Sequence, residues 1–335
     1  MRPTFAYVGA FTTEKRKARG EGIAVYRIDP ASGIWSRIQA LDAIPNPHFL
    51  TLDRTQCFLY SAHGDSSQAG AYARDPASGM LRFLGAQETG GDNSSTVVTD
   101  PANRFVVLAN GPGIAVFPRN ADGSLGPRCE LVIPPGEAGP WRKEQHGPHP
   151  HQAIFDLTGR FVVVPDKGLD KIHVYRFDAA RGKLESCDPP FVKARYGAIP
   201  RHIAFHPHAP YAYVVNEMDS TVNAYRWDSE RGVLEPFQRI ATTPDDFVGD
   251  NTGAEIAILP SGRFLYASNR GHDSIVIYAV DRANGKLAHV GWEPVQGRKP
   301  RFFGLDPDAT HLYACNEASH TIVEFRIDQE SGKLT

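Results

Sequence analysis

Residues 264–285 read FLYASNRGHDSIVIYAVDRANG, and this stretch contains the pattern that decides the fold. An apolar segment, Phe264–Asn269, ends in an amide side chain, and a second segment of alternating pattern, Ser274–Asp281, follows it. A turn that contains glycine, Ala283–Gly285, closes the unit. Period-two alternation bounded by turn residues is typical of β-strands, so the stretch predicts an antiparallel pair of strands.

The same unit recurs seven times along the chain. Its first strand is expected at Phe5–Ala10, Phe58–Ala62, Phe105–Asn110, Phe161–Asp166, Ala212–Asn216, Phe264–Asn269 and Leu312–Asn316. Its second strand is expected at Gly22–Asp29, Gly70–Asp75, Gly113–Asn120, Lys171–Asp178, Thr221–Asp228, Ser274–Asp281 and Thr321–Asp328. The repeat length of roughly 45–58 residues is typical of the blades of β-propellers.

An inner strand precedes these units on the channel side, as at Pro150–Asp156, and an outer strand follows each glycine turn. We therefore expect an all-β fold: a single seven-bladed β-propeller of four-stranded antiparallel blades over residues 1–335. The first unit has no inner strand before Thr4, and Met1–Phe5 leads straight into a strand. Because the last unit stops at Thr335 where its outer strand should begin, we expect the closing strands after residue 335.

Composition limits the classes of function. Hydrophobic residues make up 41% and charged residues 22%, which suits a large core and not a disordered chain. The formal net charge is −2 and the longest basic run is the short Lys15–Lys17, so neither nucleic acid nor a membrane surface is an expected partner. The four scattered cysteines form no C-x-x-C motif and indicate thiols in a reducing cytoplasm, with one disulfide left open. The sequence leaves the oligomeric state open.

Strand register places many ionisable side chains at one mouth of the channel. Antiparallel neighbours bring the start of each inner strand beside the end of the next strand. The starts of the inner strands carry His48, Ser95, His151, Arg201, Glu255 and Arg301, and the following ends carry His63, Asn110, Asp166, Lys167, Glu217, Arg270 and Glu317. Charges around a narrow mouth perturb one another's pKa values, so this mouth is the predicted site of any chemistry. The alternative is a belt of salt bridges, Arg201–Glu217 and Arg270–Glu255, that only closes the channel.

Several motifs resemble the lactonase family of seven-bladed propellers, which includes a bacterial 6-phosphogluconolactonase and a fungal 3-carboxymuconate lactonising enzyme. The motifs are HGPHPHQ at 146–152, VPDKG at 164–168, IPRH at 199–202, VNE at 215–217, AEI at 254–256, SNRGHDSI at 268–275 and PRFF at 300–303. The resemblance covers essentially the whole chain. It implies a catalytic set of His151, Arg201, Glu217 and Arg270, all of which belong to the ring at the predicted mouth.

Both family reactions make or break a lactone. Hydrolysis needs a base for water and a cation for the oxyanion, so Glu217 or His151 could be the base while Arg201 and Arg270 hold the substrate. The most favoured activity is metal-independent hydrolysis of an anionic sugar-acid lactone, most like that of a 6-phosphogluconolactonase. Cycloisomerisation of a muconate and a non-catalytic binding module are the alternatives. The residues expected to contact the small-molecule lactone are His149, Gln152, Asp166, Lys167, Glu255 and Arg301.

The neighbouring histidines His146, His149 and His151 raise the question of a metal ion. Metal sites in propeller lactonases are built from carboxylates and amides, and two arginines beside an ion would repel it. We therefore expect no metal and no organic cofactor. The long segment Pro134–Pro148 is expected to fold over the mouth.

Overall fold

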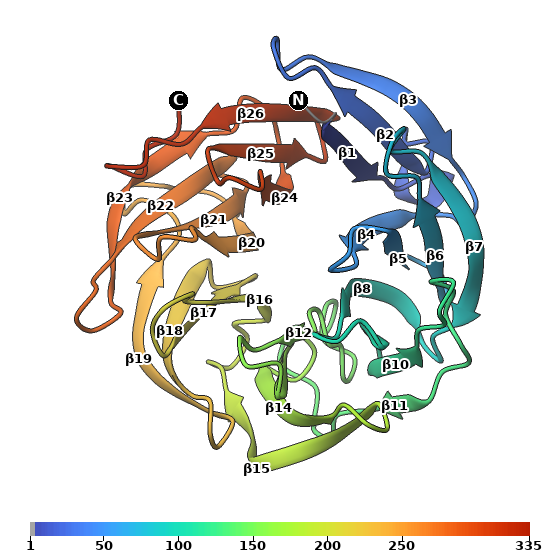
Figure 1. Ribbon diagram of the computed structural model, residues 1–335. Coiled ribbons are helices and arrows are strands. Elements are labelled where there is room, and N and C mark those ends of the chain that lie inside the picture. The colour runs from blue at the N-terminus through green and yellow to red at the C-terminus, as the bar shows by residue number, and fades with distance from the viewer. Residues whose placement is uncertain (1–3) are drawn as a thin grey trace.

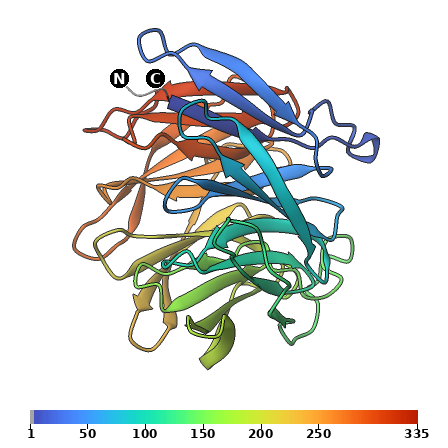
Figure 2. The same cartoon turned by 45° about the vertical axis from the view of Figure 1, so that its right-hand side comes forward.

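The computed structural model describes residues 4–335, so the expected course of Met1–Pro3 lies outside the described residues. Within them, seven antiparallel sheets stand around a central axis (Figure 1), and the view in Figure 2 shows the sheets stacked as successive blades. The predicted seven-bladed β-propeller is confirmed. In this part of the chain no helix is long and apolar enough to cross a membrane.

The first and last sheets have three strands each and the five between them have four. The first sheet contains β1 (Thr4–Gly9), β2 (Ile23–Ile28) and β3 (Trp35–Leu41), and a 3-10 helix η1 (Glu14–Arg16) lies between its first two strands. The second and third contain β4 (Pro47–Leu52), β5 (Phe58–His63), β6 (Gln68–Arg74), β7 (Leu81–Glu88), β8 (Asp92–Thr99), β9 (Phe105–Gly111), β10 (Ile114–Pro118) and β11 (Glu130–Val132). The fourth and fifth contain β12 (Ile154–Phe155), β13 (Phe161–Asp166), β14 (Lys171–Asp178), β15 (Lys183–Lys193), β16 (Pro200–Phe205), β17 (Tyr211–Asn216), β18 (Thr221–Asp228) and β19 (Val233–Ala241). The last two contain β20 (Thr252–Ile258), β21 (Phe264–Arg270), β22 (Ser274–Val280), β23 (Leu287–Pro294), β24 (Pro300–Leu305), β25 (His311–Asn316) and β26 (Thr321–Arg326).

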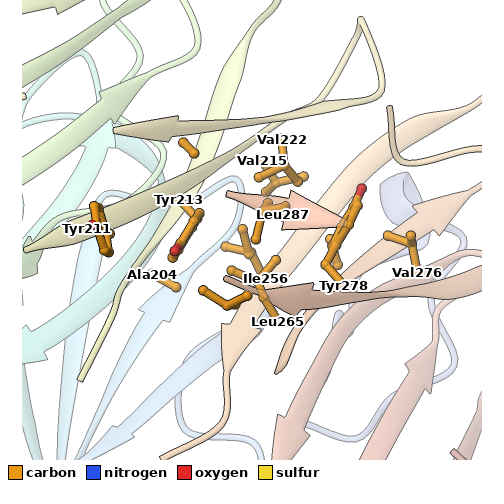
Figure 3. Packing of buried hydrophobic residues seen from close by; sticks show 13 residues of the cluster. Ala204, Tyr211, Tyr213, Val215, Val222, Ile256, Leu265, Val276, Tyr278 and Leu287 are labelled. Atoms are coloured by element: carbon orange, nitrogen blue, oxygen red, sulfur yellow. The ribbon is translucent and has the colours of Figure 1, made fainter. Parts of the chain in front are cut away.

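The core lies between the faces of neighbouring sheets. Figure 3 shows one such layer, in which Tyr213 and Val215 of β17 pack against Ile256 of β20 and Leu265 of β21. Each of these side chains is almost fully buried, which stabilises the fold by about 1.5–3 kcal/mol per large apolar residue. The alternating residues predicted as strands therefore form the contacts between blades.

At four places among residues 4–335 a tyrosine fastens one blade to the glycine turn of the next. The hydroxyl of Tyr213 donates to the carbonyl of Gly285 at 2.9 Å, and the hydroxyl of Tyr266 donates to that of Gly332 at 2.8 Å. Both glycines have φ of 73°, a left-handed conformation that glycine adopts without steric cost. The glycine turn that marks the repeat in the sequence is thus a structural requirement.

The inner strands begin with an irregularity that bears on function. The pairing register shifts between Pro47 and Phe49, between Pro200 and His202, and between Pro300 and Phe302. A β-bulge of this kind inserts an extra residue and re-aims its side chain. The extra residues are His48, Arg201 and Arg301, which all belong to the predicted ring.

The inner strand of the fourth sheet is shorter than the expected Pro150–Asp156. Only Ile154–Phe155 form the strand β12, and Pro150 makes an isolated bridge to Asp166. Proline has no N–H for a ladder, and the N–H of His149 donates to the Asp166 carboxylate at 2.9 Å instead. The segment around His151 is therefore held by this side chain together with two backbone hydrogen bonds, from the N–H of His151 to the carbonyl of Pro165 at 2.9 Å and from the N–H of Lys167 to the carbonyl of His149 at 3.1 Å.

Candidate active site

Two adjoining cavities open at the mouth where the inner strands begin. The smaller one, with a volume of about 320 Å³, is lined by Phe11, Arg16, His48, Asn93, Ser95, Lys143, Glu144, His146, His149, His151, Lys167, Glu217 and Arg301. The larger one, of about 680 Å³, shares Phe11, Arg16, His48, Ser95, His151 and Arg301 with it and adds Arg201, His202 and Glu255. Most of the predicted ring residues thus line one or both of these adjoining cavities.

The carboxylate of Glu217 lies at the centre of a cluster of cations. Its Oε1 is 2.9 Å from Nη2 of Arg270, and its Oε2 is 3.4 Å from Nε of Arg201 and 4.0 Å from Nζ of Lys167. Burial acts to raise the pKa of Glu217, but the charges of Lys167, Arg270 and Arg201 outweigh it and hold that pKa well below its ordinary value. Glu217 is therefore an ionised anchor for the two arginines.

Arg201 is 3% exposed and faces the larger cavity. Its Nη1 donates to the carbonyl of Ala254 at 2.6 Å, and its Nε has no hydrogen-bond partner among the described residues. Burial, followed by the charges of Arg270 and Arg301, lowers the pKa of Arg201 to about 9, so the guanidinium is still charged at neutral pH. A buried cation at the wall of a cavity suits a developing oxyanion.

Three histidines line up beside this arginine. The ring of His151 lies 6.4 Å from that of His149 and 5.1 Å from that of His202. Burial, with the charges of Arg201 and His202, holds the pKa of His151 well below its ordinary value, and burial lowers the pKa of His149 to about 4. His151 is thus neutral at pH 7. Its Nδ1 is buried without a hydrogen-bond partner among residues 4–335, and the residue lines both cavities.

His202 was not predicted as a site residue, yet it lies inside the cluster. Its Nδ1 is 2.7 Å from Oε1 of Glu255, and Oε1 also accepts the N–H of Ile256 at 3.0 Å. Glu255, expected to contact substrate, lines the larger cavity but is engaged with this imidazole. The belt predicted as an alternative forms only in part, because Arg201 and Arg270 both pair with Glu217.

The other predicted substrate contacts divide into two groups. His149, Lys167 and Arg301 line the smaller cavity. Gln152 and Asp166 line neither of the two cavities found among residues 4–335. The Oε1 of Gln152 accepts the N–H of Ile203 at 2.7 Å. Oδ1 of Asp166 accepts the backbone N–H groups of His149, Gly168 and Leu169. These two side chains hold the backbone around the mouth.

Two loops cover the mouth. Lys143, Glu144 and His146 of the segment Pro134–Pro148 line the smaller cavity, which confirms the expected position of this segment. Nε1 of Trp141 fixes the segment by donating to the carbonyl of Gly197 at 2.8 Å. The second loop, between β1 and β2, supplies Phe11 and Arg16 and was not predicted. The signal that could have indicated it is the basic run Lys15–Lys17.

Among residues 4–335, no group of three or more His, Cys, Asp and Glu side chains is arranged to hold a metal ion.

Comparison with known proteins places the chain among relatives of similar length. The family profile described as "Lactonase, 7-bladed beta-propeller" matches residues 5–335. A 6-phosphogluconolactonase from Bacillus subtilis is 36% identical over 312 residues, which cover 92% of this chain and 86% of that protein. A putative 6-phosphogluconolactonase from Bacteroides fragilis superposes with a TM-score of 0.90 at 30% identity, covering 99% and 93% of the two chains. A periplasmic gluconolactonase from Pseudomonas aeruginosa superposes with a TM-score of 0.88 at 30% identity, covering 99% and 94%.

Proposed function

Because the chain belongs to the lactonase family of seven-bladed β-propellers, we propose that it is a lactone hydrolase that acts on 6-phosphogluconolactone without a metal ion. The observation that carries the proposal is the meeting of the neutral His151 with the cationic Arg201 at one cavity, beside the Glu217–Arg270 pair. The cavity that His151 and Arg201 both line has a volume of about 680 Å³, which is within the range of small-molecule sites and accommodates a sugar-sized substrate.

In the proposed reaction, His151 accepts a proton from water as the water oxygen attacks the lactone carbonyl carbon. The carbonyl oxygen becomes an oxyanion, which Arg201 stabilises through its positive charge at the cavity wall. The bond from this carbon to the ring oxygen then breaks, and the protonated His151 returns its proton to the departing oxygen. The product is an open-chain acid that ionises to a carboxylate.

Two groups act on Arg201 rather than on the substrate. Glu217 holds the arginine in place through its carboxylate, and Arg270, which also donates to the carbonyl of Gly253 at 3.0 Å, holds Glu217 from the other side. The carboxylate of Glu217 is already engaged by three cations, whereas the imidazole of His151 makes no ion pair among the described residues, which favours His151 for proton abstraction. His202, oriented by Glu255, supports one side of the His151 ring.

The test is a hydrolysis screen with a pH indicator that includes 6-phosphogluconolactone, glucono-lactone and a muconolactone. Turnover of the phosphorylated lactone well above the spontaneous rate, with solvent heavy oxygen appearing in the product carboxylate, is the expected result. Turnover of none of these lactones would refute the proposal. Cycloisomerisation, which relatives named as 6-phosphogluconolactonases do not favour, would instead place solvent hydrogen on carbon.

We also propose a cytoplasmic location, since a phosphorylated sugar lactone carries charge that does not cross an apolar bilayer unaided. One structural neighbour is named as periplasmic, so the location is worth measuring directly. Cell fractionation that recovers the protein with periplasmic markers would contradict this part of the proposal.

A further inference from the structure

The smaller cavity has an excess of cationic side chains that the proposed reaction does not use. Arg16, Lys143, Lys167 and Arg301 line it together with two carboxylates, Glu144 and Glu217. Lys167 lies 3.4 Å from Glu144 and 4.0 Å from Glu217, so the charge of both carboxylates is already shared with it. Arg16 pairs with Asp65, whereas Arg301 comes no closer than 3.9 Å to its acidic partner Glu317, so Arg301 is the less compensated of the two arginines.

Arg301 is presented to the cavity with its donors free. It occupies the bulge of β24, and its side chain is 29% exposed. Its nearest acidic partner is Glu317 at 3.9 Å, and among residues 4–335 its guanidinium donates no hydrogen bond. Arginine presents five donors in a planar fork that matches phosphate oxygens. The guanidinium of Arg301 can therefore donate hydrogen bonds to an anion in the cavity.

Arg16 reaches the same place from the loop between β1 and β2. Its Nη2 donates to Oδ1 of Asp65 at 3.0 Å and to Oδ1 of Asn93 at 3.1 Å, which fixes the guanidinium. Within the described residues its Nη1 donates no hydrogen bond, although Arg16 lines both cavities. Arg16 is thus held rigidly while one of its nitrogens stays available.

An aromatic platform brings the two guanidinium groups together. The guanidinium carbon of Arg16 lies 4.8 Å from the centre of the Phe11 ring, and that of Arg301 lies 5.7 Å from it. The ring of His48 stacks on Phe11 at 5.1 Å, which fixes the platform in turn. Burial lowers the pKa of Arg301, the charges of Glu317 and Glu217 raise it, and those of Arg270 and Arg16 lower it further, so an anion placed between the two guanidinium groups would reduce their mutual repulsion.

We propose that Arg16 and Arg301 form a phosphate subsite that selects phosphorylated over unphosphorylated sugar lactones. The proposal rests on the proposed function, because it assigns Arg16 and Arg301 to the phosphate of that substrate. The two arginines share a cavity with His151, so one sugar-sized ligand can contact all three. The loop between β1 and β2 thereby determines substrate preference, whereas the inner strands carry the chemistry.

The experiment compares kcat/KM for 6-phosphogluconolactone and for glucono-lactone in wild type, Arg16→Gln and Arg301→Gln. A charged hydrogen bond is worth enough that each variant should lose about 10- to 100-fold on the phosphorylated lactone and less than about threefold on the other. Lys15→Gln is the matched control, because Lys15 also pairs with Asp65, at 3.3 Å, but is 77% exposed and lines neither cavity. It should leave both values within about twofold.

Equal losses on the two lactones, or the same loss in Lys15→Gln as in Arg16→Gln, would overturn the proposal. So would a change of preference in Lys143→Gln alone, because that would place the phosphate at the opposite loop. If Arg16→Gln does not fold, Arg301→Gln still tests the subsite, since its guanidinium donates no hydrogen bond within the described fold.

Calorimetry with inorganic phosphate separates this proposal from the proposed function. Wild type should bind phosphate, and both arginine variants should bind it at least tenfold more weakly whether or not any lactone is turned over. Absence of turnover together with this binding pattern would refute the hydrolase activity and support the subsite. Binding that is absent, or that the two variants leave unchanged, would refute the subsite.

Discussion

Replacing Glu217 by Gln removes a negative charge that lies 2.9 Å from Arg270, 3.4 Å from Arg201 and 4.0 Å from Lys167. The side chain of Glu217 is only 13% exposed and that of Arg201 only 4%, so solvent compensates little for the loss. Removing one partner of a buried ion pair costs about 3–5 kcal/mol, and the residual exposure favours the lower value. With an unfolding entropy of about 2 cal/mol/K per residue, a loss of about 3 kcal/mol lowers Tm by about 4 °C for a chain of 335 residues.

The stability lost in Glu217→Gln should depend on pH in a definite direction. The folded pKa of Glu217 is lowered, so its ionised form stabilises the fold fully above the unfolded pKa of about 4.3. This contribution disappears as the pH falls through that value towards the lower folded pKa. The difference in Tm between wild type and Glu217→Gln should therefore be constant from pH 8 to about pH 6 and shrink below about pH 4.

Thermal denaturation by circular dichroism across this pH range is the assay. Glu144→Gln is the control, because Glu144 also pairs with Lys167, at 3.4 Å, but is 47% exposed. An exposed pair contributes about 0–1 kcal/mol, so this variant should melt within about 1 °C of wild type. Equal melting of Glu217→Gln and wild type at pH 7, or a difference that grows in acid, would refute the view that Glu217 anchors the arginines.

Four further outcomes follow from the site. Arg201→Lys and Arg270→Lys keep the charge but lose the planar fork, so kcat/KM should fall at least about tenfold in each; unchanged turnover would remove these arginines from the mechanism. His151→Ala should lower kcat by about 10²–10⁴-fold, more than Glu217→Gln does, and the reverse order would identify Glu217 as the base. Burial raises the pKa of Asp166 to about 6, so ionisation of this carboxyl destabilises the fold as the pH rises from about 4 through 6. Asp166→Asn should therefore have a higher Tm than wild type at pH 8 but not at pH 4, and a lower Tm at pH 8 would contradict this. Treatment with a chelator should leave turnover unchanged, and recovery of a lost activity only on adding a divalent ion would contradict the metal-free reaction.

The fold could be predicted because its determinants are local and repeated. Each apolar strand, each alternating strand and each glycine turn lies within a few residues of sequence, and four of the turn glycines accept a tyrosine hydroxyl from the preceding blade. Gly285 and Gly332 illustrate this, since both adopt a left-handed φ and both accept a tyrosine hydroxyl from the preceding blade. The face that carries the ionisable residues followed from strand direction alone.

The parts of the site that were missed depend on contacts between distant segments. Arg16 reaches the cavity through Asp65 and Asn93, which are 49 and 77 residues away along the chain. His202 belongs to the cluster because Glu255, 53 residues further on, orients its ring. No local pattern encodes such pairs, and for the same reason Gln152 and Asp166 looked like substrate contacts although their side chains bind backbone.

The β-bulge at the start of the inner strands explains how one backbone arrangement places different side chains at the mouth of the channel. His48, Arg201 and Arg301 occupy the same bulge in three blades, so the side chain changes while the backbone stays alike. In the blade of Arg201 this backbone is strained, because the β-branched Ile199 has a φ of 58°, at a cost of about 1–3 kcal/mol. The buried carboxylate of Asp170 maintains it by accepting the N–H groups of Gly197 at 2.7 Å and Ile199 at 2.9 Å. The fold thus uses interactions outside the cavity to hold a conformation whose benefit is the direction in which Arg201 points.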